Sequence, residues 1–239
     1  MPRNSYFQFK QFRIIQERSA MKVGMDGVLL GAWADASGAE RILDIGTGTG
    51  LIALMMAQKN TTALIDAIEI DPDALEESIL NAQNSPWNNR IKPELCSFQE
   101  FSGRENKKYD LIVSNPPYFT NGEKAPAQNR AMARHSDSLS LGDLISGAAK
   151  ILNTSGKIAL VLPSATLPEI GTCITENKLF MSRLCRIKPN LQKPEFRILM
   201  ELTNSECFLK EENLMIEFER HHDYTPEYKA LTKDFYLKF

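Results

Sequence analysis

The chain has 239 residues and a net charge of −2, and 43% of its residues are hydrophobic and 24% are charged. This composition indicates a globular protein with a sizeable core and excludes a polycation that coats any nucleic acid. The apolar runs are too short to cross a bilayer, and the first residues lack the apolar stretch of a signal peptide. The four cysteines and three histidines show no metal-ligand spacing. We therefore expect one cytoplasmic domain, residues 1–239, without a metal or a membrane segment.

The predicted elements begin with an N-terminal extension, residues 1–40, which contains a helix near 28–34 and is expected to lie over the ligand cleft. Apolar, β-branched runs typical of buried parallel strands follow at 41–45, 64–70, 91–96, 109–114 and 157–162. Helical spacing is found at 51–59, 73–84, 141–152 and 164–177. Residues 221–239 are expected to form a short tail helix that begins at Thr225-Pro226.

The order of these elements predicts the fold. Strands that alternate with helices form a parallel sheet with right-handed crossovers. The last two expected strands, 180–187 and 196–203, are joined by a loop with two prolines, so they should form an antiparallel hairpin at the sheet edge. The sequence therefore predicts an α/β, Rossmann-like fold: a seven-stranded, mostly parallel sheet with an antiparallel edge hairpin and helices on both faces.

A glycine-rich loop follows the first strand of this sheet, with Asp44 before Gly46, Thr47, Gly48 and Gly50. Glycines permit positive φ angles and close approach of a ligand to the backbone, and the helix that follows offers free N–H groups. A dinucleotide-binding loop would place its third glycine one residue later. With Asp44, the loop resembles motif I of class I methyltransferases, which implies that these five residues bind S-adenosylmethionine and its product S-adenosylhomocysteine. An NAD-type loop and a plain tight turn are the alternatives.

Carboxylates stand at the ends of the first two strands. Asp44 lies just before the turn, where a carboxylate is able to hold an ammonium group. Glu69 lies 19 residues past Gly50, where an acidic residue accepts the ribose hydroxyls of a bound nucleoside. Asp71 is the alternative for the ribose, although Asp71-Pro72 equally resembles the start of a helix. We therefore expect Glu69 to bind the cofactor.

The fourth strand stops at Asn115-Pro116-Pro117-Tyr118. Prolines fix φ, supply no N–H and hold the preceding residue extended, so this loop is stiff. The lone pair of an amino group on an aromatic ring is delocalised, and two acceptors that bind its hydrogens would aim that lone pair at a methyl donor. The Asn115 side chain and the Pro116 carbonyl are the expected acceptors, and Tyr118 offers a face on which a flipped base stacks. A structural Pro-Pro turn is the alternative.

This motif at the end of the fourth strand, after motif I, resembles motif IV of the amino-nitrogen methyltransferases. The resemblance implies that Asn115 and Pro116 bind the target amino group and that Tyr118 stacks on it, which makes these the catalytic residues. Pro117 and Phe119 are further candidates for lining the target pocket, although packing behind Tyr118 suits Phe119 equally well. Such enzymes methylate adenine in DNA, guanine or adenine in RNA, or a protein glutamine, and the motif does not separate these substrates.

Basic residues gather in three segments near the predicted cleft. Lys10 and Arg13 belong to the N-terminal extension, and Arg130 and Arg134 follow Tyr118. The hairpin of the last two strands contributes Arg183, Arg186, Lys188, Lys193 and Arg197. Because post-strand loops gather at the cleft in this fold, a basic rim there suits a phosphate backbone. Ordinary solvated surface is the alternative.

Residues 9–12, 21–33 and 223–228, in order with the two motifs, resemble the bacterial tRNA adenine-N6 methyltransferases that modify the adenine beside the anticodon of a valine tRNA. In that family the segment around 22–26 lies against the cofactor. This makes Asp26 a cofactor-binding candidate, although Asp26 equally suits the N-cap of the next helix. We therefore expect a monomeric, S-adenosylmethionine-dependent methyltransferase that acts on adenine N6 in tRNA. The same chemistry on a ribosomal RNA or DNA base, or on a protein glutamine, is the alternative.

Overall fold

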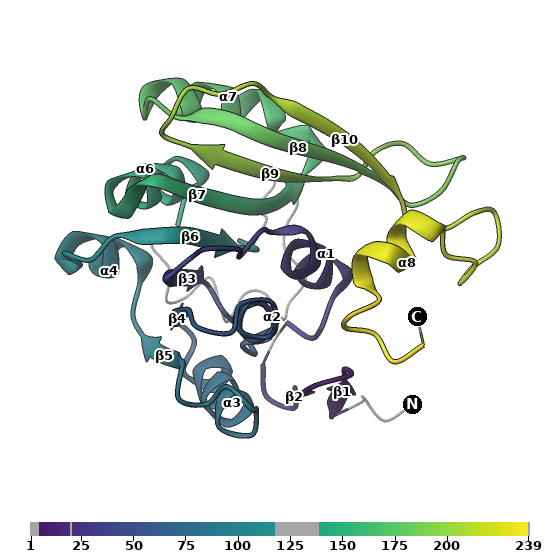
Figure 1. The fold of residues 1–239 in the computed structure, drawn as a ribbon, viewed down its shortest axis with the longest axis horizontal. Helices are drawn as coiled ribbons and strands as arrows, with labels where there is room; N and C mark the ends of the chain where they lie inside the picture. Colours follow the sequence, from purple (N-terminus) through teal and green to yellow (C-terminus); the bar gives the residue numbers. More distant parts are fainter. Residues whose placement is uncertain (1–4, 20, 118–138, 239) are drawn as a thin grey trace.

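The central sheet has eight strands in the order β10-β8-β9-β7-β6-β3-β4-β5, within the residues 5–19, 21–117 and 139–238 that this computed structural model describes (Figure 1). The strands are β3 (Arg41–Ile45), β4 (Leu64–Glu69), β5 (Ile91–Leu95), β6 (Tyr109–Ser114), β7 (Leu152–Pro163), β8 (Phe180–Lys188), β9 (Arg197–Thr203) and β10 (Lys210–Met215). Neighbours in the sheet are parallel except β7 with β9 and β9 with β8. The predicted mostly parallel sheet with an antiparallel hairpin of β8 and β9 is confirmed, but the hairpin does not form the edge of the sheet, because β10 pairs with the outer side of β8.

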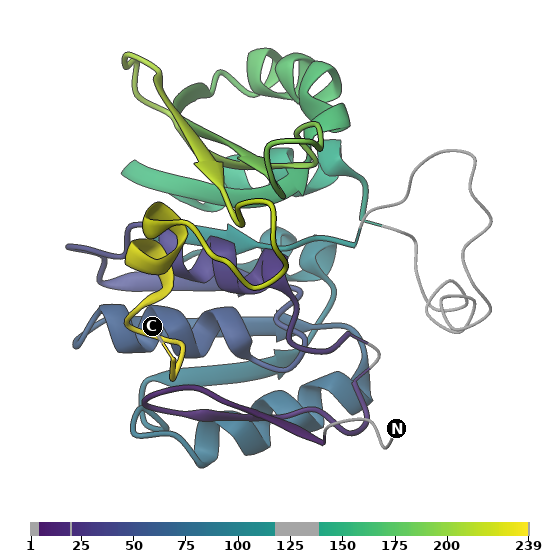
Figure 2. The same cartoon turned by 90° about the vertical axis from the view of Figure 1, so that its right-hand side faces the viewer.

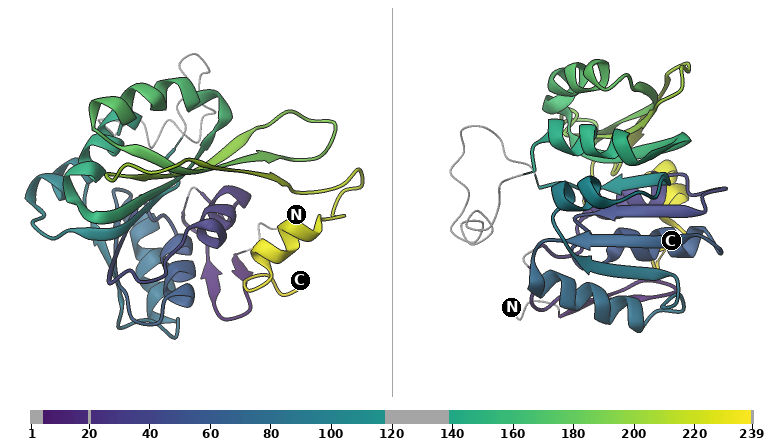
Figure 3. Two further views of the ribbon diagram at one scale, coloured as in Figure 1. Left: turned by 45° about the horizontal axis from the view of Figure 1, so that its top comes forward. Right: turned by 90° about the vertical axis from the view of Figure 1, so that its left-hand side faces the viewer.

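Helices cover both faces of the sheet, because its central strands are rich in Val, Ile and Leu and are buried on both sides (Figures 1 and 3). One layer consists of α1 (Met25–Trp33), α2 (Leu51–Lys59) and α3 (Pro72–Gln83). The other consists of α4 (Phe98–Arg104), α6 (Leu141–Ile151), the short 3-10 helix η1 (Ser164–Thr166) and α7 (Leu167–Glu176). Two separate cores result: Leu54 and Ile65 belong to the first, and Ile145 and Leu160 to the second.

The structure adds an eighth strand, β10, to the seven that the sequence predicts. Half of its residues are charged, and its sequence lacks the apolar alternation that marks a strand. It pairs in parallel with β8, and two ion pairs cross between the strands, Arg183 to Glu212 at 3.3 Å and Arg186 to Glu211 at 3.5 Å. A charged edge strand of this kind also discourages pairing with another chain.

Strand β7 begins at Leu152, directly after α6, and so starts earlier than the sequence predicts. Gly156 lies inside this strand. A Cβ atom at Gly156 would come within 2.7 Å of Leu152 Cδ1 and 2.8 Å of the Tyr109 carbonyl oxygen. The glycine therefore allows close packing between β7 and β6.

The N-terminal extension contains a hairpin of β1 (Tyr6–Gln8) and β2 (Arg13–Ile15), followed by α1. Phe9 and Phe12 are buried at the hairpin turn, with ring centroids 4.7 Å apart. Helix α1 begins earlier than predicted, with Gly24 as its N-cap, so the alternative that Asp26 caps this helix is wrong. The predicted tail helix is α8 (Pro226–Thr232), which Thr225 caps and which packs on α1 (Figure 2).

Helices α1 and α2 approach closely at Gly31, where a Cβ atom would lie within 3.0 Å of Met55 Cβ. Gly31→Ala is therefore expected to lower the free energy of unfolding by about 1–3 kcal/mol, because a packed interior resists added volume. The measurement is Tm by calorimetry, with Gly171→Ala in α7 as the control. A Cβ at Gly171 meets nothing within 4 Å, so that variant should melt no lower than the wild type. Equal melting of both variants would contradict this packing.

Candidate functional site

The glycine-rich loop connects β3 to α2 in a backbone conformation that requires glycine. Gly46, Gly48 and Gly50 have φ angles of 68°, 56° and 83°, a region that other residues rarely adopt. The N–H groups of Gly46 and Thr47 donate to the Ile68 carbonyl at 2.9 and 3.0 Å, so the loop is joined to the neighbouring strand β4. Among the described residues, a Cβ at Gly46 or Gly48 would meet nothing within 4 Å. The backbone of the loop is thus open to a ligand.

The Asp44 side chain holds the glycine-rich loop in place through hydrogen bonds. Its side chain is fully buried, and its Oδ2 accepts hydrogen bonds from the Thr47 hydroxyl at 2.6 Å and the Ala53 N–H at 3.0 Å. Burial raises the pKa of the Asp44 carboxyl to about 7. Within the described residues its Oδ1 has no hydrogen-bond partner. A buried acceptor of this kind is costly unless a ligand or water satisfies it.

Glu69 joins the end of β4 to the same loop. Its carboxylate is 9% exposed and accepts from the N–H groups of Gly48 at 2.8 Å, Ile70 at 2.7 Å and Asp71 at 2.9 Å. A carboxylate offers about four acceptor positions, so capacity for a further donor remains. Asp71, the alternative for the ribose, is the N-cap of α3 and accepts from Asp73 N–H at 3.0 Å. The helix-start interpretation of Asp71 is therefore confirmed.

Two exposed apolar side chains, which the sequence did not lead us to expect, flank Glu69. Ile70 is 48% exposed and Leu95 is 52% exposed, and Leu95 pairs with Glu69 in the sheet. Both stand at the carboxyl ends of parallel strands, where ligands bind in this fold. The signal in the sequence is Ile70, an apolar residue that directly follows the carboxylate at the end of the strand. Such a residue offers a surface for a flat base.

The N-terminal extension is attached beside the loop by α3. The buried Glu77 carboxylate accepts from three consecutive backbone N–H groups, those of Glu17 at 2.5 Å, Arg18 at 2.6 Å and Ser19 at 2.9 Å. Asn81, also buried, donates to the carbonyls of Ile15 and Thr49, both at 2.9 Å. One side chain thus contacts both the extension and the glycine-rich loop.

Asn115 directly follows the end of β6 and lies next to the glycine-rich loop. Ser114 pairs with Ile45 in the sheet, and its hydroxyl donates to the Ile45 carbonyl at 2.8 Å. Asn115 and Pro116 are half-buried and Pro117 is exposed. A Cβ added to Gly27 of α1 would lie 4.0 Å from Asn115 Nδ2. The two predicted motifs therefore meet at one edge of the sheet.

Four other predicted site residues, Tyr118, Phe119, Arg130 and Arg134, lie outside the described residues. Asp26 is described, and its Oδ2 accepts from Arg197 Nε at 2.9 Å. Its contact with a cofactor stays a prediction.

Residues 26–169 match the family model of the methyltransferase small domain, and this segment contains the glycine-rich loop, Glu69 and Asn115. The tRNA1(Val) (adenine(37)-N6)-methyltransferase of Parabacteroides distasonis is 48% identical to this chain, covering 98% of this chain and 99% of that protein. The enzyme of the same name from Trichodesmium erythraeum is 47% identical to this chain, and the match covers 98% of this chain and 98% of that protein. The chain belongs to the tRNA1(Val) (adenine(37)-N6)-methyltransferase family.

A solved structure supports the fold of this methyltransferase. A predicted O-methyltransferase from Agrobacterium tumefaciens superimposes with a TM-score of 0.68 and 20% identity, covering 88% of this chain and 96% of the other. At that identity the likeness shows the fold alone. Together with the family membership it confirms the class I methyltransferase fold that the sequence predicts.

The basic residues of the methyltransferase differ in how far they are available to a substrate. In the hairpin of β8 and β9, three arginines are engaged in ion pairs: Arg183 with Glu201 and Glu212, Arg186 with Glu195 and Glu211, and Arg197 with Asp26. Lys188 and Lys193, at the end of β8 and in the loop that follows, are exposed. Arg13 is exposed, donates to Gln8 Oε1 at 2.9 Å and lies over the Tyr6 ring at 4.5 Å.

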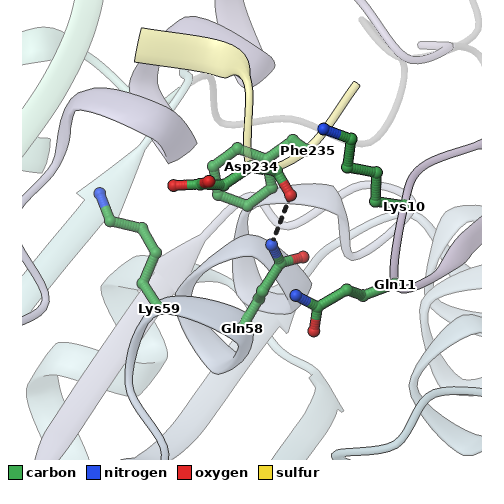
Figure 4. A pocket seen from close by; sticks show the side chains of 6 residues that line it. All are labelled: Lys10, Gln11, Gln58, Lys59, Asp234 and Phe235. Carbon is green, nitrogen blue, oxygen red and sulfur yellow. Dashed lines mark hydrogen bonds between the residues drawn. The ribbon is translucent and has the colours of Figure 1, made fainter. Parts of the chain in front are cut away.

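Lys10 lies at the opposite end of α2 from the glycine-rich loop. There it borders a hollow of about 470 Å³ lined by Lys10, Gln11, Gln58, Lys59, Asp234 and Phe235 (Figure 4). Gln58 donates to the Asp234 carbonyl at 2.8 Å across it. A role for Lys10 would therefore be a contact remote from the catalytic loop, which a large substrate such as an RNA is able to make.

Within the described residues, one group of side chains has metal-ligand types close together: Glu217, His221 and His222, with ligand atoms within 4.8 Å of one another. Glu217 already bonds His221 Nδ1 at 3.3 Å and His222 N–H at 3.1 Å, and His222 Nδ1 lies 3.0 Å from the Tyr224 hydroxyl. These bonds account for the turn before α8.

None of the helices in the described part of the chain is both long enough and apolar enough to span a membrane.

Proposed function

We propose that this protein transfers a methyl group from S-adenosylmethionine to N6 of an adenine in tRNA. The observation that carries the proposal is the meeting of the glycine-rich loop, Glu69 and Asn115 at the carboxyl edge of three adjacent strands, β4, β3 and β6. Family membership over nearly the whole chain supports the tRNA adenine substrate.

The residues present fit S-adenosylmethionine. Asp44 Oδ1, which has no hydrogen-bond partner in the part of the chain that the structure describes, is a buried acceptor suited to an ammonium hydrogen. Glu69 keeps acceptor capacity for the ribose hydroxyls. Ile70 and Leu95 offer exposed apolar surface for the adenine ring of the cofactor. When bound, the cofactor supplies a methyl group on a positively charged sulfur. We propose that Gly46, Thr47, Gly48 and Gly50 bind it through their backbone.

The Asn115 side-chain oxygen and the Pro116 carbonyl are proposed to accept the two hydrogens of the target amino group. Asn115 lies beside α1, where a Cβ added to Gly27 would be 4.0 Å from its Nδ2. These two acceptors would localise the lone pair on N6 and direct it at the methyl group that the bound cofactor would supply, and N6 would give up one of its hydrogens as a proton to water. Because the leaving group is a neutral thioether, positioning and electrostatics suffice and no metal is proposed. Every group comes from one chain, so a monomer suffices.

Tyr118 and Phe119 are proposed to enclose the target base, and Pro117, exposed beside Asn115, to border it. Lys10, Arg13, Arg130 and Arg134 are proposed to contact the RNA backbone. The named relatives act on adenine 37 of tRNA1(Val), and we propose the same position here. Because the proposed substrate is a tRNA, we propose that the reaction takes place in the cytoplasm.

The test is methyl transfer from labelled S-adenosylmethionine to three pools: RNA from cells that lack this enzyme, DNA, and protein. Label recovered as N6-methyladenosine from the tRNA fraction is the expected result. Label in DNA, in protein or in guanosine would overturn the substrate while leaving the glycine-rich loop and catalytic loop in their roles.

Cofactor affinity should rise with pH, because the ammonium group needs the ionised form of Asp44. With a pKa of about 7 in the free enzyme, about one tenth of Asp44 is ionised at pH 6 and about nine tenths at pH 8. The Kd for S-adenosylhomocysteine is therefore expected to be roughly tenfold weaker at pH 6 than at pH 8, with proton release on binding. Calorimetry at the two values checks this. Asp44→Asn should bind weakly with a flat profile, and a flat profile in the wild type would contradict the role of Asp44.

A further inference from the structure

The first turn of α1 is held by an ion pair that neither motif includes. Asp26 Oδ2 accepts from Arg197 Nε at 2.9 Å, and the two side chains are 20% and 25% exposed. Arg197 is the first residue of β9 and pairs with Pro163, the last residue of β7. The pair therefore joins the N-terminal extension to the carboxyl edge of the sheet, across 171 residues of sequence.

The residue after Asp26 lies against the catalytic loop. A Cβ on Gly27 would come within 3.0 Å of Leu51 Cδ2, in the residue that directly follows the glycine-rich loop, and 4.0 Å from Asn115 Nδ2. The first turn of α1 thus lies close to both motifs. A small shift of this turn would change the space available to the Asn115 amide.

The backbone hydrogen bond that closes this turn is long, since the Val28 N–H donates to the Gly24 carbonyl at 3.3 Å. Its N-cap is Gly24, which makes no side-chain cap bond. An acidic residue in the first turn interacts favourably with the helix dipole, and the partly buried guanidinium fixes the direction of that carboxylate. The loss of either Asp26 or Arg197 would remove this side-chain contact from the turn.

We infer that Asp26 and Arg197 are a positioning pair, which sets the orientation of the Asn115 amide through Gly27 without touching cofactor or substrate. The inference rests on the proposed function of Asn115. It replaces the cofactor contact expected for Asp26 with an indirect role.

The test is a double-mutant cycle of Asp26→Ala, Arg197→Ala and the combination, measured as kcat, KM for S-adenosylmethionine and Tm. Each single variant is expected to lower kcat more than tenfold while KM stays within about threefold, and the double variant should be no worse than the poorer single one. Asp26→Glu, which keeps the carboxylate, should recover part of kcat. A role in folding alone would lower Tm and leave kcat per folded enzyme unchanged, which would overturn the inference.

Direct cofactor binding by Asp26 predicts a different pattern. Asp26→Ala would then raise KM more than tenfold and Arg197→Ala would not, which would also overturn the inference. Gly27→Ala tests the same turn in a second way, because the added Cβ crowds Leu51 beside Asn115, and it should lower kcat. Gly171→Ala in α7, where an added Cβ meets nothing within 4 Å among the described residues, should not. If the wild-type enzyme did not methylate adenine in tRNA, that result would overturn the proposed function and not the positioning role of this pair.

Discussion

Asn115→Ala is expected to reduce methyl transfer by roughly a thousandfold while S-adenosylhomocysteine binds within about threefold of the wild-type Kd. The variant removes one of two acceptors for the target amino group, and the loss of one preorganised polar contact to a transition state costs about 10²–10³ in rate. Binding of the cofactor should survive, because Asp44 and Glu69 hold the glycine-rich loop through bonds that Asn115 does not make. Single-turnover kinetics and calorimetry measure the two quantities.

Two further variants make the result specific. Asn115→Asp keeps an acceptor oxygen and should retain more activity than Asn115→Ala. Asn204→Ala removes an exposed asparagine whose amide donates to the Asn153 carbonyl near the opposite edge of the sheet, and it should be as active as the wild type. Parallel loss of cofactor binding and turnover in Asn115→Ala would contradict the assignment of Asn115 to the target amine.

Glu69→Ala is expected to weaken S-adenosylhomocysteine binding by about a hundredfold. The variant leaves the N–H groups of Gly48, Ile70 and Asp71 without their acceptor and removes the proposed contact with the ribose. A hydrogen bond to a charged group contributes about 1.5–3 kcal/mol, and about 2.8 kcal/mol corresponds to a hundredfold in Kd. Calorimetry of the purified variant gives the Kd directly.

Asp71→Ala is the matched control, since it removes the neighbouring carboxylate from the same strand end. Its loss takes away the N-cap of α3 and should cost about 1 kcal/mol of stability, with the Kd changed by less than about threefold. If Asp71→Ala weakened binding more than Glu69→Ala, the ribose would belong to Asp71. Glu69→Gln, which keeps one acceptor oxygen, should fall between Glu69→Ala and the wild type.

The sequence predicted the parts of the site that local pattern and topology determine. Short apolar runs alternating with helical spacing imply parallel strands, and parallel strands end at one edge. The glycine-rich loop, Glu69 and Asn115 each follow such a strand, so their meeting follows from the order of β3, β4 and β6. The spacing Gly46-x-Gly48-x-Gly50 also has a local reason, since all three residues have positive φ.

The rest depended on contacts between distant segments, which a single sequence does not display. Strand β10 carries no apolar alternation and is held by pairing with β8. The bond between Asp26 and Arg197 joins residues 171 positions apart, so the sequence offered a helix cap or a cofactor contact for Asp26 instead. The same holds for the buried Glu77, whose three backbone partners lie 58 to 60 residues away.

The most direct test of the account is methyl transfer to two unmodified transcripts of tRNA1(Val), one with adenine and one with guanine at position 37, the position named for the relatives. The account predicts one N6-methyladenosine for each adenine-37 transcript and none in the guanine-37 transcript, with the reaction lost in Asn115→Ala. Equal methylation of both transcripts, or a product other than N6-methyladenosine, would contradict it.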